Sequence, residues 1–315
     1  ITLDFPVLDN DELAKIKHIE SKPGVGKSHT IKGLYRMDAG AEGLAARIRE
    51  IFEEVDSAIA NDVTYLILSD RDSNRDLAPI PSLLLTSAVH HHLIRTGNRT
   101  RLGLVIEAGD VREVHHVAAL IGYGAAAINP YLAMESVEQM VLTGELAGLT
   151  VKKAHANLIK GLGKGVLKIM SKMGISTYMS YCGAQIFEAI GLNKALIDKY
   201  FKGTASNVEG IGVFEIAEEA LRLHKLAFGN DPVLANALDA GGEYAYRVRG
   251  EDHMWTPDSI AKLQHSTRQG PEKGGYQTYK EYANIINDQT KRQMTLRGLF
   301  EFKIDPAKAI PLDEV

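Results

Sequence analysis

The chain has 315 residues, of which 45% are hydrophobic and 24% charged, and its formal net charge is −4 at pH 7. This is the composition of an ordinary globular protein, and the weak negative charge gives no general attraction to nucleic acid or to anionic membranes. The single cysteine, Cys182, excludes an internal disulfide and any all-cysteine metal or iron–sulfur site within the chain. No apolar run approaches the roughly 18 residues of a membrane span and no signal peptide is visible, so we expect a cytoplasmic location with no membrane or nucleic-acid partner.

The first candidate site along the chain is Gly26-Lys27-Ser28, which matches the end of a phosphate-binding loop. The full motif needs a glycine where this chain has Ser21, together with a buried strand before the loop and a helix after it. The preceding segment is charged and amphipathic, and the following segment contains glycines and β-favouring residues. A nucleotide hydrolase is therefore the weakest functional hypothesis, and we expect residues 21–30 to form a surface turn or the beginning of a short strand.

Apolar runs and helical periodicity alternate over the next part of the chain. Helical patterns cover residues 43–60, 81–95, 111–124, 133–146, 151–174 and 184–192, whereas strand-like runs cover residues 63–68, 101–110 and 125–131. The periodicity fades between residues 206 and 250, and residues 256–268 and 275–300 look helical again. The pattern predicts an α/β fold with repeated strand–helix units and a parallel sheet, followed by a mainly helical C-terminal segment.

Polar residues follow the predicted strands, where the carboxyl ends of parallel strands would form one edge of the sheet. Asp70, Arg71, Glu107 and Asp110 are the candidates for binding a small metabolite or a partner at this edge. The alternative is that these side chains cap helices and pair with one another. No nucleophile or metal-ligand set accompanies them, so we assign no catalytic residue.

The histidine runs at residues 90–92 and 115–116 suggest metal binding at first sight. Consecutive residues on a helix point about 100° apart, so adjacent histidines cannot all face one ion. We therefore expect packing and hydrogen-bonding histidines and no metal site. Cys182 lies in an apolar segment with no activating base, which favours a buried, inert thiol.

Several long stretches resemble the large subunit of glutamate synthase in order and spacing. They include "LILSDRD", "IPSLLLTSAVHHHLIR", "EAGDVREVHHVAALIGYGAAAINPYLAMES" and "GVLKIMSKMGISTYMSYCGAQIFEAIGL", and the match continues through "HMWTPDSIAKLQHSTR" and "KAIPLDEV". The resemblance covers roughly residues 5–315. These motifs are long and unusual, which makes the resemblance specific.

The resemblance implies an enzyme that moves the amide nitrogen of glutamine onto 2-oxoglutarate and reductively makes two glutamates. The family combines a glutaminase domain, a central α/β domain, an FMN-binding barrel with a 3Fe-4S cluster and a β-helix. Residues 1–250 would be the central domain, truncated at its N-terminus and similar to a degenerate or incomplete (β/α) barrel. Residues 251–315 would be a linker and the start of the FMN-binding domain.

The same resemblance implies that the chemistry lies outside this chain. The glutaminase nucleophile is an N-terminal cysteine, whereas this chain begins with Ile1, and a single cysteine cannot supply the ligands of the cluster. We expect a fragment without cofactors of its own, with FMN and the 3Fe-4S cluster in the intact parent enzyme. The implied partners are the glutaminase and FMN domains of the same polypeptide and a small electron-donor subunit or ferredoxin. The donor stays open among NADPH, NADH and ferredoxin.

The resulting hypothesis is a structural and ammonia-channelling linking region that is inert as an isolated chain. The expected face toward the flavin domain or the ammonia route is the segment Ser171, Lys172, Met173, Gly174, Ile175 and Ser176. The alternative is a stand-alone, non-catalytic binding or scaffold protein derived from the same domain.

Overall fold

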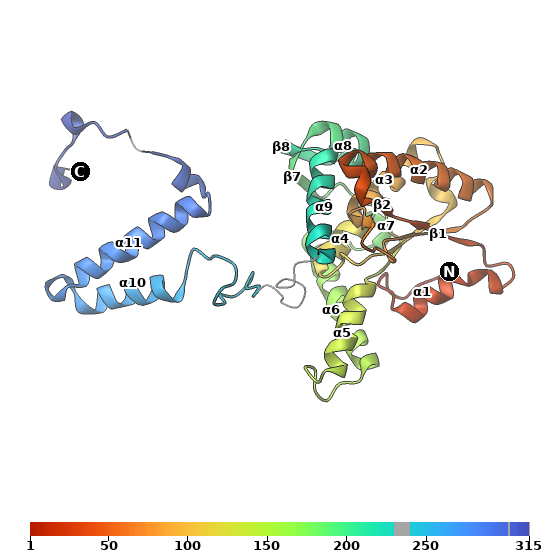
Figure 1. Ribbon diagram of the computed structural model, residues 1–315, viewed down its shortest axis with the longest axis horizontal. Coiled ribbons are helices and arrows are strands. Elements are labelled where there is room, and N and C mark those ends of the chain that lie inside the picture. The colour runs from red at the N-terminus through yellow and green to blue at the C-terminus, as the bar shows by residue number, and fades with distance from the viewer. Residues whose placement is uncertain (230–239, 302, 315) are drawn as a thin grey trace. The chain divides into compact units, whose positions relative to one another are not determined.

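The computed structural model describes residues 1–229, 240–301 and 303–314. The chain folds as two compact units, Ile1–Asn230 and Asp231–Val315 (Figure 1). The parallel sheet belongs to the first unit, and the second unit is helical where it has regular structure.

A four-stranded parallel sheet forms the centre of the first unit. Its order is β1-β3-β5-β6, and the strands are β1 (Ser28–Lys32), β3 (Tyr65–Ser69), β5 (Gly103–Glu107) and β6 (Ala127–Asn129). The register places Ser69 opposite Glu107 and Glu107 opposite Asn129. Val7 pairs in parallel with Ile128 and continues the sheet beyond β6.

A helix follows each strand and returns the chain to the next strand of the sheet. These helices are α2 (Gly40–Ala60), α3 (Ser82–Arg95) and α4 (Val114–Gly122), while α5 (Tyr131–Leu142) and α6 (Val151–Lys172) follow β6. The short strands β2 (Leu34–Arg36) and β4 (Leu77–Pro79) pair antiparallel beside the main sheet. Neighbouring strands of the main sheet are consecutive strand–helix units, as in an incomplete (β/α) barrel, which confirms the predicted fold class.

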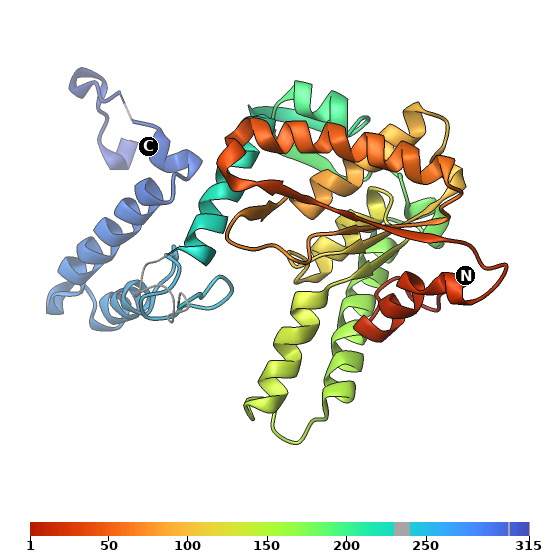
Figure 2. The ribbon, with the colours of Figure 1, turned by 45° about the vertical axis from the view of Figure 1, so that its right-hand side comes forward.

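The two faces of the sheet are covered by different helices because side chains alternate along each strand. Leu66 and Leu68 of β3 belong to the large core formed with α2, α3 and α4. Ile67 lies in a smaller cluster with Leu13 and Ile16 of α1 (Asn10–Lys17). The helix α1 therefore covers the face opposite α2 (Figure 2).

The sequence prediction fails at residues 184–192, where a short helix was expected. The chain instead forms β7 (Glu188–Leu192), which pairs in parallel with β8 (Ala205–Ile211). Gly191 has φ +79°, a backbone conformation outside the helical region, and the partner strand supplies hydrogen bonds that the local sequence does not reveal. Between α6 and β8 the structure also contains α7 (Tyr178–Tyr181) and α8 (Lys194–Tyr200).

The fading periodicity after residue 206 also hides a helix. Helix α9 (Val213–Phe228) packs against α2 with Ala217 fully buried. Four of its large apolar side chains are exposed, which obscures the amphipathic pattern. Residues 230–239 of the same stretch lie outside the described part of the chain.

The second unit contains α10 (Pro257–Gln269) and α11 (Gly275–Arg292), which pack against each other. Both predicted helices are confirmed, although the second ends at Arg292 and a 3-10 turn follows at Leu296–Leu299. The fully or nearly buried residues of this unit, within its described ranges, are Ser259, Ser266, Gly275 and Gln289. No helix within the described residues is long and apolar enough to cross a membrane.

Candidate functional site at the carboxyl edge of the sheet

The candidate site is a group of polar side chains where β3, β5 and β6 end. We call it the edge cluster, and it consists of Lys17, Ser69, Asp70, Arg71, Glu107, Tyr131 and Glu135. Its members come from α1, from the ends of β3 and β5, and from α5. Segments distant in sequence therefore meet at the edge that the strand pattern predicts.

Glu107 is the centre of the edge cluster and is only 2% exposed. Lys17 Nζ donates to both carboxylate oxygens at 2.9 and 2.8 Å. Ser69 Oγ donates to Oε2 at 2.7 Å and Arg71 Nε donates to Oε1 at 2.8 Å. Each oxygen of Glu107 thus accepts two hydrogen bonds, which fills the acceptor capacity of a carboxylate.

Burial on its own would raise the pKa of Glu107. The hydrogen bonds from Lys17, Ser69 and Arg71 and the positive charge of Lys17 outweigh this effect and lower the pKa below its ordinary value. Glu107 is therefore a permanently ionised anchor at neutral pH. It holds α1 against the end of the sheet through Lys17.

Arg71 is fixed from three sides. Besides the bond to Glu107, its Nη1 donates to Glu135 at 2.9 Å. Its guanidinium also lies over the ring of Tyr131, 4.2 Å from the ring centre, in a cation–π arrangement. Because Tyr131 and Glu135 belong to α5, Arg71 ties that helix to the end of β3.

Asp70 differs from Glu107 because it lacks a cationic partner among the contacts described. It is 8% exposed, and both of its oxygens accept from the backbone N–H of Gly109 at 2.9 Å. Burial, aided by the charges of Asp110 and Glu107, raises its pKa to about 6, although the Gly109 and Tyr131 hydrogen bonds oppose the rise. Asp70 is the member of the edge cluster that gains or loses a proton close to neutral pH.

Asp110, the fourth candidate of the edge, has a separate structural role. Its carboxylate accepts from the backbone N–H of Ser82 at 3.0 Å and from the Ser82 hydroxyl at 2.6 Å. The first of these bonds gives a partner to a backbone N–H group in the first turn of α3, where a negative charge also stabilises the helix. The structure brings Asp70, Arg71 and Glu107 together and places Asp110 beside them at the helix start.

Chemically, the edge cluster supplies fixed, mutually compensated charges and one proton-exchanging carboxyl group. Lys17 and Glu135 could not be found from the sequence, because they lie far along the chain from Glu107 and Arg71. The sequence feature that could have pointed to Lys17 is its position at the end of an amphipathic helix. Within the described residues, no group of three or more His, Cys, Asp or Glu side chains is arranged to hold a metal ion.

The segment predicted to face a neighbouring domain, residues 171–176, forms the last turn of α6 and the bend after it. Gly174 makes the bend with φ +69°, and Met173 is 47% exposed. Ile175 is half-buried and packs against the main core, whereas the rest of the segment faces solvent.

A phosphate-binding loop follows a strand and opens a helix. The Gly26-Lys27-Ser28 loop has the opposite order, because it follows no strand of the sheet and leads into strand β1. Lys27 Nζ donates to the carbonyl of Asn61 at 3.2 Å, and Ser28 Oγ donates to the carbonyl of Lys17 at 2.8 Å. The expectation of a turn and a strand start over residues 21–30 is confirmed.

The histidine runs make packing and hydrogen-bonding contacts. His90 Nδ1 accepts from Arg99 Nε at 2.8 Å, and burial together with the Arg99 charge lowers the pKa of His90 to about 4. His92 stacks on Phe52 with ring centres 4.4 Å apart. Cys182 is half-buried, and this burial raises the pKa of its thiol, as expected of an unreactive cysteine.

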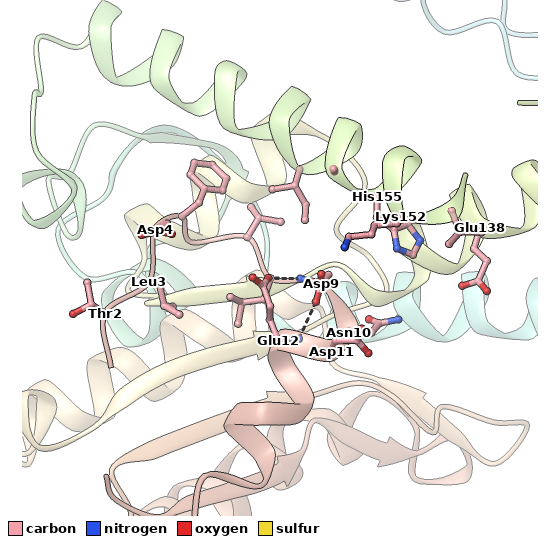
Figure 3. Close-up of a pocket in the computed structure, with 16 residues that line it drawn as sticks. Thr2, Leu3, Asp4, Asp9, Asn10, Asp11, Glu12, Glu138, Lys152 and His155 are labelled. Atoms are coloured by element: carbon pink, nitrogen blue, oxygen red, sulfur yellow. Dashed lines mark hydrogen bonds between the residues drawn. The ribbon is translucent and has the colours of Figure 1, made fainter. Parts of the chain in front are cut away.

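A cavity with a volume of about 910 Å³ lies between the N-terminal segment 2–12 and helices α5 and α6 (Figure 3). Glu138, Lys152 and His155 line the helical side, and the opposite side is rich in carboxylates. Two of those carboxylates, Asp9 and Glu12, form a reciprocal cap of α1. The sequence pattern gives no sign of this cavity, because its walls combine segments more than 120 residues apart.

The fold and the edge cluster define a partial-barrel α/β domain whose strand ends carry paired charges. The chain belongs to the glutamate synthase central domain family, whose family model matches residues 1–193.

Three relatives illustrate the similarity. The chain is 42% identical to the large chain of the NADPH glutamate synthase of Bacillus subtilis over 315 residues, 100% of this chain and 20% of that protein. It is 38% identical to the NADH glutamate synthase of Schizosaccharomyces pombe over 100% of this chain and 15% of that protein. It is 36% identical to the chloroplastic ferredoxin-dependent glutamate synthase of Spinacia oleracea over 98% of this chain and 19% of that protein.

The chain thus spans only about a fifth or less of the length of these curated relatives. Among solved structures, the flavin-binding domain of baker's yeast flavocytochrome b2 matches 61% of this chain and 44% of that chain, with 13% identity and a TM-score of 0.36.

Proposed function

We propose that this chain is the central linking region of a glutamate synthase large subunit. The observation that carries the proposal is the family match over residues 1–193, together with relatives that align over the whole chain. The intact enzyme would transfer the amide nitrogen of glutamine to 2-oxoglutarate and form two glutamates. This chain would hold the two reaction centres in register.

The edge cluster supports a structural role at the site where barrel enzymes commonly place catalytic groups. The charges of Glu107 and Arg71 are already compensated by partners inside the chain, so neither needs a substrate to balance it. FMN, a 3Fe-4S cluster and the glutaminase nucleophile would belong to other domains of the polypeptide. A small electron-donor subunit or ferredoxin would deliver electrons, and the enzyme would work in the cytoplasm.

We further propose that residues 1–250 belong to the central domain and that residues 251–315 lead into the FMN-binding domain. Helices α10 and α11 belong to a different compact unit from the one that contains the sheet, which supports a connecting role. Residues 171–176 would face the flavin domain or the ammonia route. Their exposure and their position at the end of α6 suit a contact with a neighbouring domain.

An intact glutamate synthase that carries this region tests the channelling role. Met173→Arg should leave glutamine hydrolysis intact but raise the ratio of ammonia released to glutamate formed, because a charged side chain would disturb the domain contact or the route. Ile94→Arg is a matched control, since Ile94 is similarly exposed at 50% but lies on α3. Equal ratios in wild type and both variants would argue against a role for residues 171–176.

The isolated chain tests the proposed inertness. Purified protein should bind no FMN after dialysis and release no ammonia from glutamine, as measured by absorbance at flavin wavelengths and by an ammonia assay. Stoichiometric flavin on the isolated chain would show that the flavin site has been placed in the wrong domain.

A further inference from the structure

The hydroxyl group of Thr86 is buried without a visible partner. Thr86 lies in the second turn of α3, and its exposed fraction is 0%. Its Oγ1 has no hydrogen-bond partner among the described residues. Buried hydroxyl groups are nearly always hydrogen-bonded, because an unpaired one destabilises the fold, so this atom requires an explanation.

A small cavity adjoins Thr86 directly beneath the edge cluster. Its volume is about 10 Å³, and its polar walls are Thr86, Asp70, Ser82 and Glu107, while the remaining walls are aliphatic. This volume is close to that needed for one water molecule. Ordered water in such places typically makes about three hydrogen bonds to polar groups that would otherwise be unsatisfied.

The hydrogen-bonding capacity of the walls shows which groups can hold such a molecule. Glu107 already accepts four bonds, two at each oxygen, and has no capacity left. Asp70 accepts from the Gly109 N–H and the Tyr131 hydroxyl, and two donors leave lone pairs on its two oxygens to spare. The Ser82 hydroxyl donates to Asp110 and can still accept, and Thr86 can donate or accept.

We propose that this cavity is a binding site for one ordered water molecule, held by the Thr86 hydroxyl, the Asp70 carboxyl group and the Ser82 hydroxyl. The water accepts from Thr86 and donates to Asp70 and Ser82. It joins the first turns of α3 to the end of β3, beside the direct link that Asp110 makes to the same helix. This water molecule is an integral part of the folded structure, unlike the water molecules that hydrate the protein surface.

A high-resolution crystal structure of the 315-residue chain tests the proposal directly. Wild type and Thr86→Ser should both show an electron-density peak within hydrogen-bonding distance of residue 86 and Asp70, since both keep the hydroxyl group. Thr86→Val has nearly the shape of threonine without the hydroxyl group, and the peak should be lost. An empty wild-type cavity, with the Thr86 hydroxyl turned toward the carbonyl of Ser82, would refute the proposal.

The sign of the stability change provides a second test. If water fills the cavity, Thr86→Val removes a partner from a hydrogen-bonded network, and the melting temperature should fall by roughly 2–4 °C. If the hydroxyl group is unpaired, the same substitution removes an unfavourable buried group and raises the melting temperature, which would contradict the proposal. Thr30→Val on the exposed side of β1 is the control and should cause no such fall.

Asp70 offers a spectroscopic readout in the same variants. Loss of the water removes a hydrogen bond that favours the ionised carboxylate, so Thr86→Val should raise the pKa of Asp70. Carboxyl ¹³C chemical shifts followed through a pH titration measure this directly. An identical titration of Asp70 in wild type and Thr86→Val would contradict the proposed bond.

Discussion

At the scale of single residues, two neighbouring buried carboxyl groups have opposite properties. Glu107 has two cationic partners and a hydroxyl donor, and these lower its pKa despite burial. Burial raises the pKa of Asp70 to about 6, since its backbone and phenol donors do not offset the burial and two acidic neighbours add to the rise. The difference lies in the partners, since both side chains are less than one-tenth exposed.

Glu107→Gln should destabilise the first unit, because Lys17 and Arg71 would lose their shared counter-charge. We expect a loss of about 2–3 kcal/mol in the free energy of unfolding, less than for a fully buried pair. The reason for the smaller loss is that Lys17 and Arg71 keep 31% and 37% of their side chains exposed. Urea unfolding at pH 7 measures this change.

Glu54→Gln is the matched control for that substitution. Glu54 pairs with Arg47 at 2.6 Å, but its side chain is 40% exposed. Ion pairs of this kind contribute roughly 0–1 kcal/mol, so the control should lose no more than that. Equal losses in the two variants would show that burial does not set the importance of Glu107.

Asp70 should make the stability of the protein depend on pH. The unfolded carboxyl group loses its proton near its ordinary pKa of 3.8, whereas the folded one keeps it until about pH 6. The native state therefore binds more protons between these values, and the contribution of Asp70 to stability falls as the pH rises through this window.

Asp70→Asn removes the titration while keeping the shape of the side chain. Since one pKa unit corresponds to about 1.4 kcal/mol, the stability of Asp70→Asn relative to wild type should increase by up to about 3 kcal/mol from pH 4 to pH 7. Urea unfolding at several pH values gives both curves. Parallel curves for the two proteins would mean that Asp70 has an ordinary pKa in the folded state.

The sequence predicted part of this residue-scale picture. Asp70, Arg71 and Glu107 could be placed together because the carboxyl ends of parallel strands meet at one edge. The contacts of Lys17 and Glu135 depend on where α1 and α5 pack, and helical periodicity does not determine the packing partner of a helix. Because the packing of α1 is not determined by periodicity, the sequence could not show whether Glu107 is paired inside the chain or open to a ligand.

At the scale of elements, the glycines of α6 show how close packing shapes a helix. A Cβ atom at Gly165 would lie 2.3 Å from a methyl group of Val114 on α4, whereas a Cβ atom at Gly161 would meet nothing within 4 Å. The glycine-rich part of α6 therefore includes one position at which close contact with α4 requires a glycine. The contact with Val114 explains why residue 165 is a glycine. No close contact requires a glycine at position 161.

The two glycines form a matched pair of substitutions. Gly161→Ala should stabilise the protein by about 0.5–1 kcal/mol, because alanine favours the helix and the space is open. Gly165→Ala should destabilise it by about 1–3 kcal/mol, because the added methyl group overpacks the contact with Val114. Chemical unfolding of both variants checks the prediction, and the same sign for both would contradict it.

Prediction of the elements succeeded where the pattern was local. Alternating apolar runs and amphipathic helices between residues 43 and 172 predicted β3, β5 and β6 and the helices that follow the strands, whereas β1 was expected only as a turn or the beginning of a short strand. It failed for β7, whose residues satisfy their backbone through β8, and for α9, whose outer face carries exposed apolar side chains such as Phe214 and Leu223. In both places a contact or surface outside the local sequence decides the structure.

At the scale of the whole molecule, the two units differ in what holds them together. The first unit has an extensive core of aliphatic side chains. Within residues 240–301 and 303–314, no large hydrophobic side chain is fully buried, and Trp255, Leu296 and Phe300 are each more than half exposed. A segment without an apolar core lacks the main driving force for folding.

Separate expression of the two units tests this difference. Residues 1–229 should unfold cooperatively in urea with a sigmoidal circular dichroism signal. Residues 240–315 alone should lose helix gradually with no cooperative transition. A sharp transition in the shorter fragment would show that it has a core of its own.

The bridge between Val7 and Ile128 has a consequence for synthesis on the ribosome. The strand order lets each strand–helix unit dock on the one made just before it. The segment that precedes β1 cannot dock in this way, because Val7 needs Ile128 and Lys17 needs Glu107. At typical elongation rates of roughly 5–20 residues per second, the N-terminal segment and α1 wait several seconds or longer for their partners to emerge. Within this unit, the segment around Val7 and helix α1 is therefore translated before its partners but is among the last parts to find its place in the sheet.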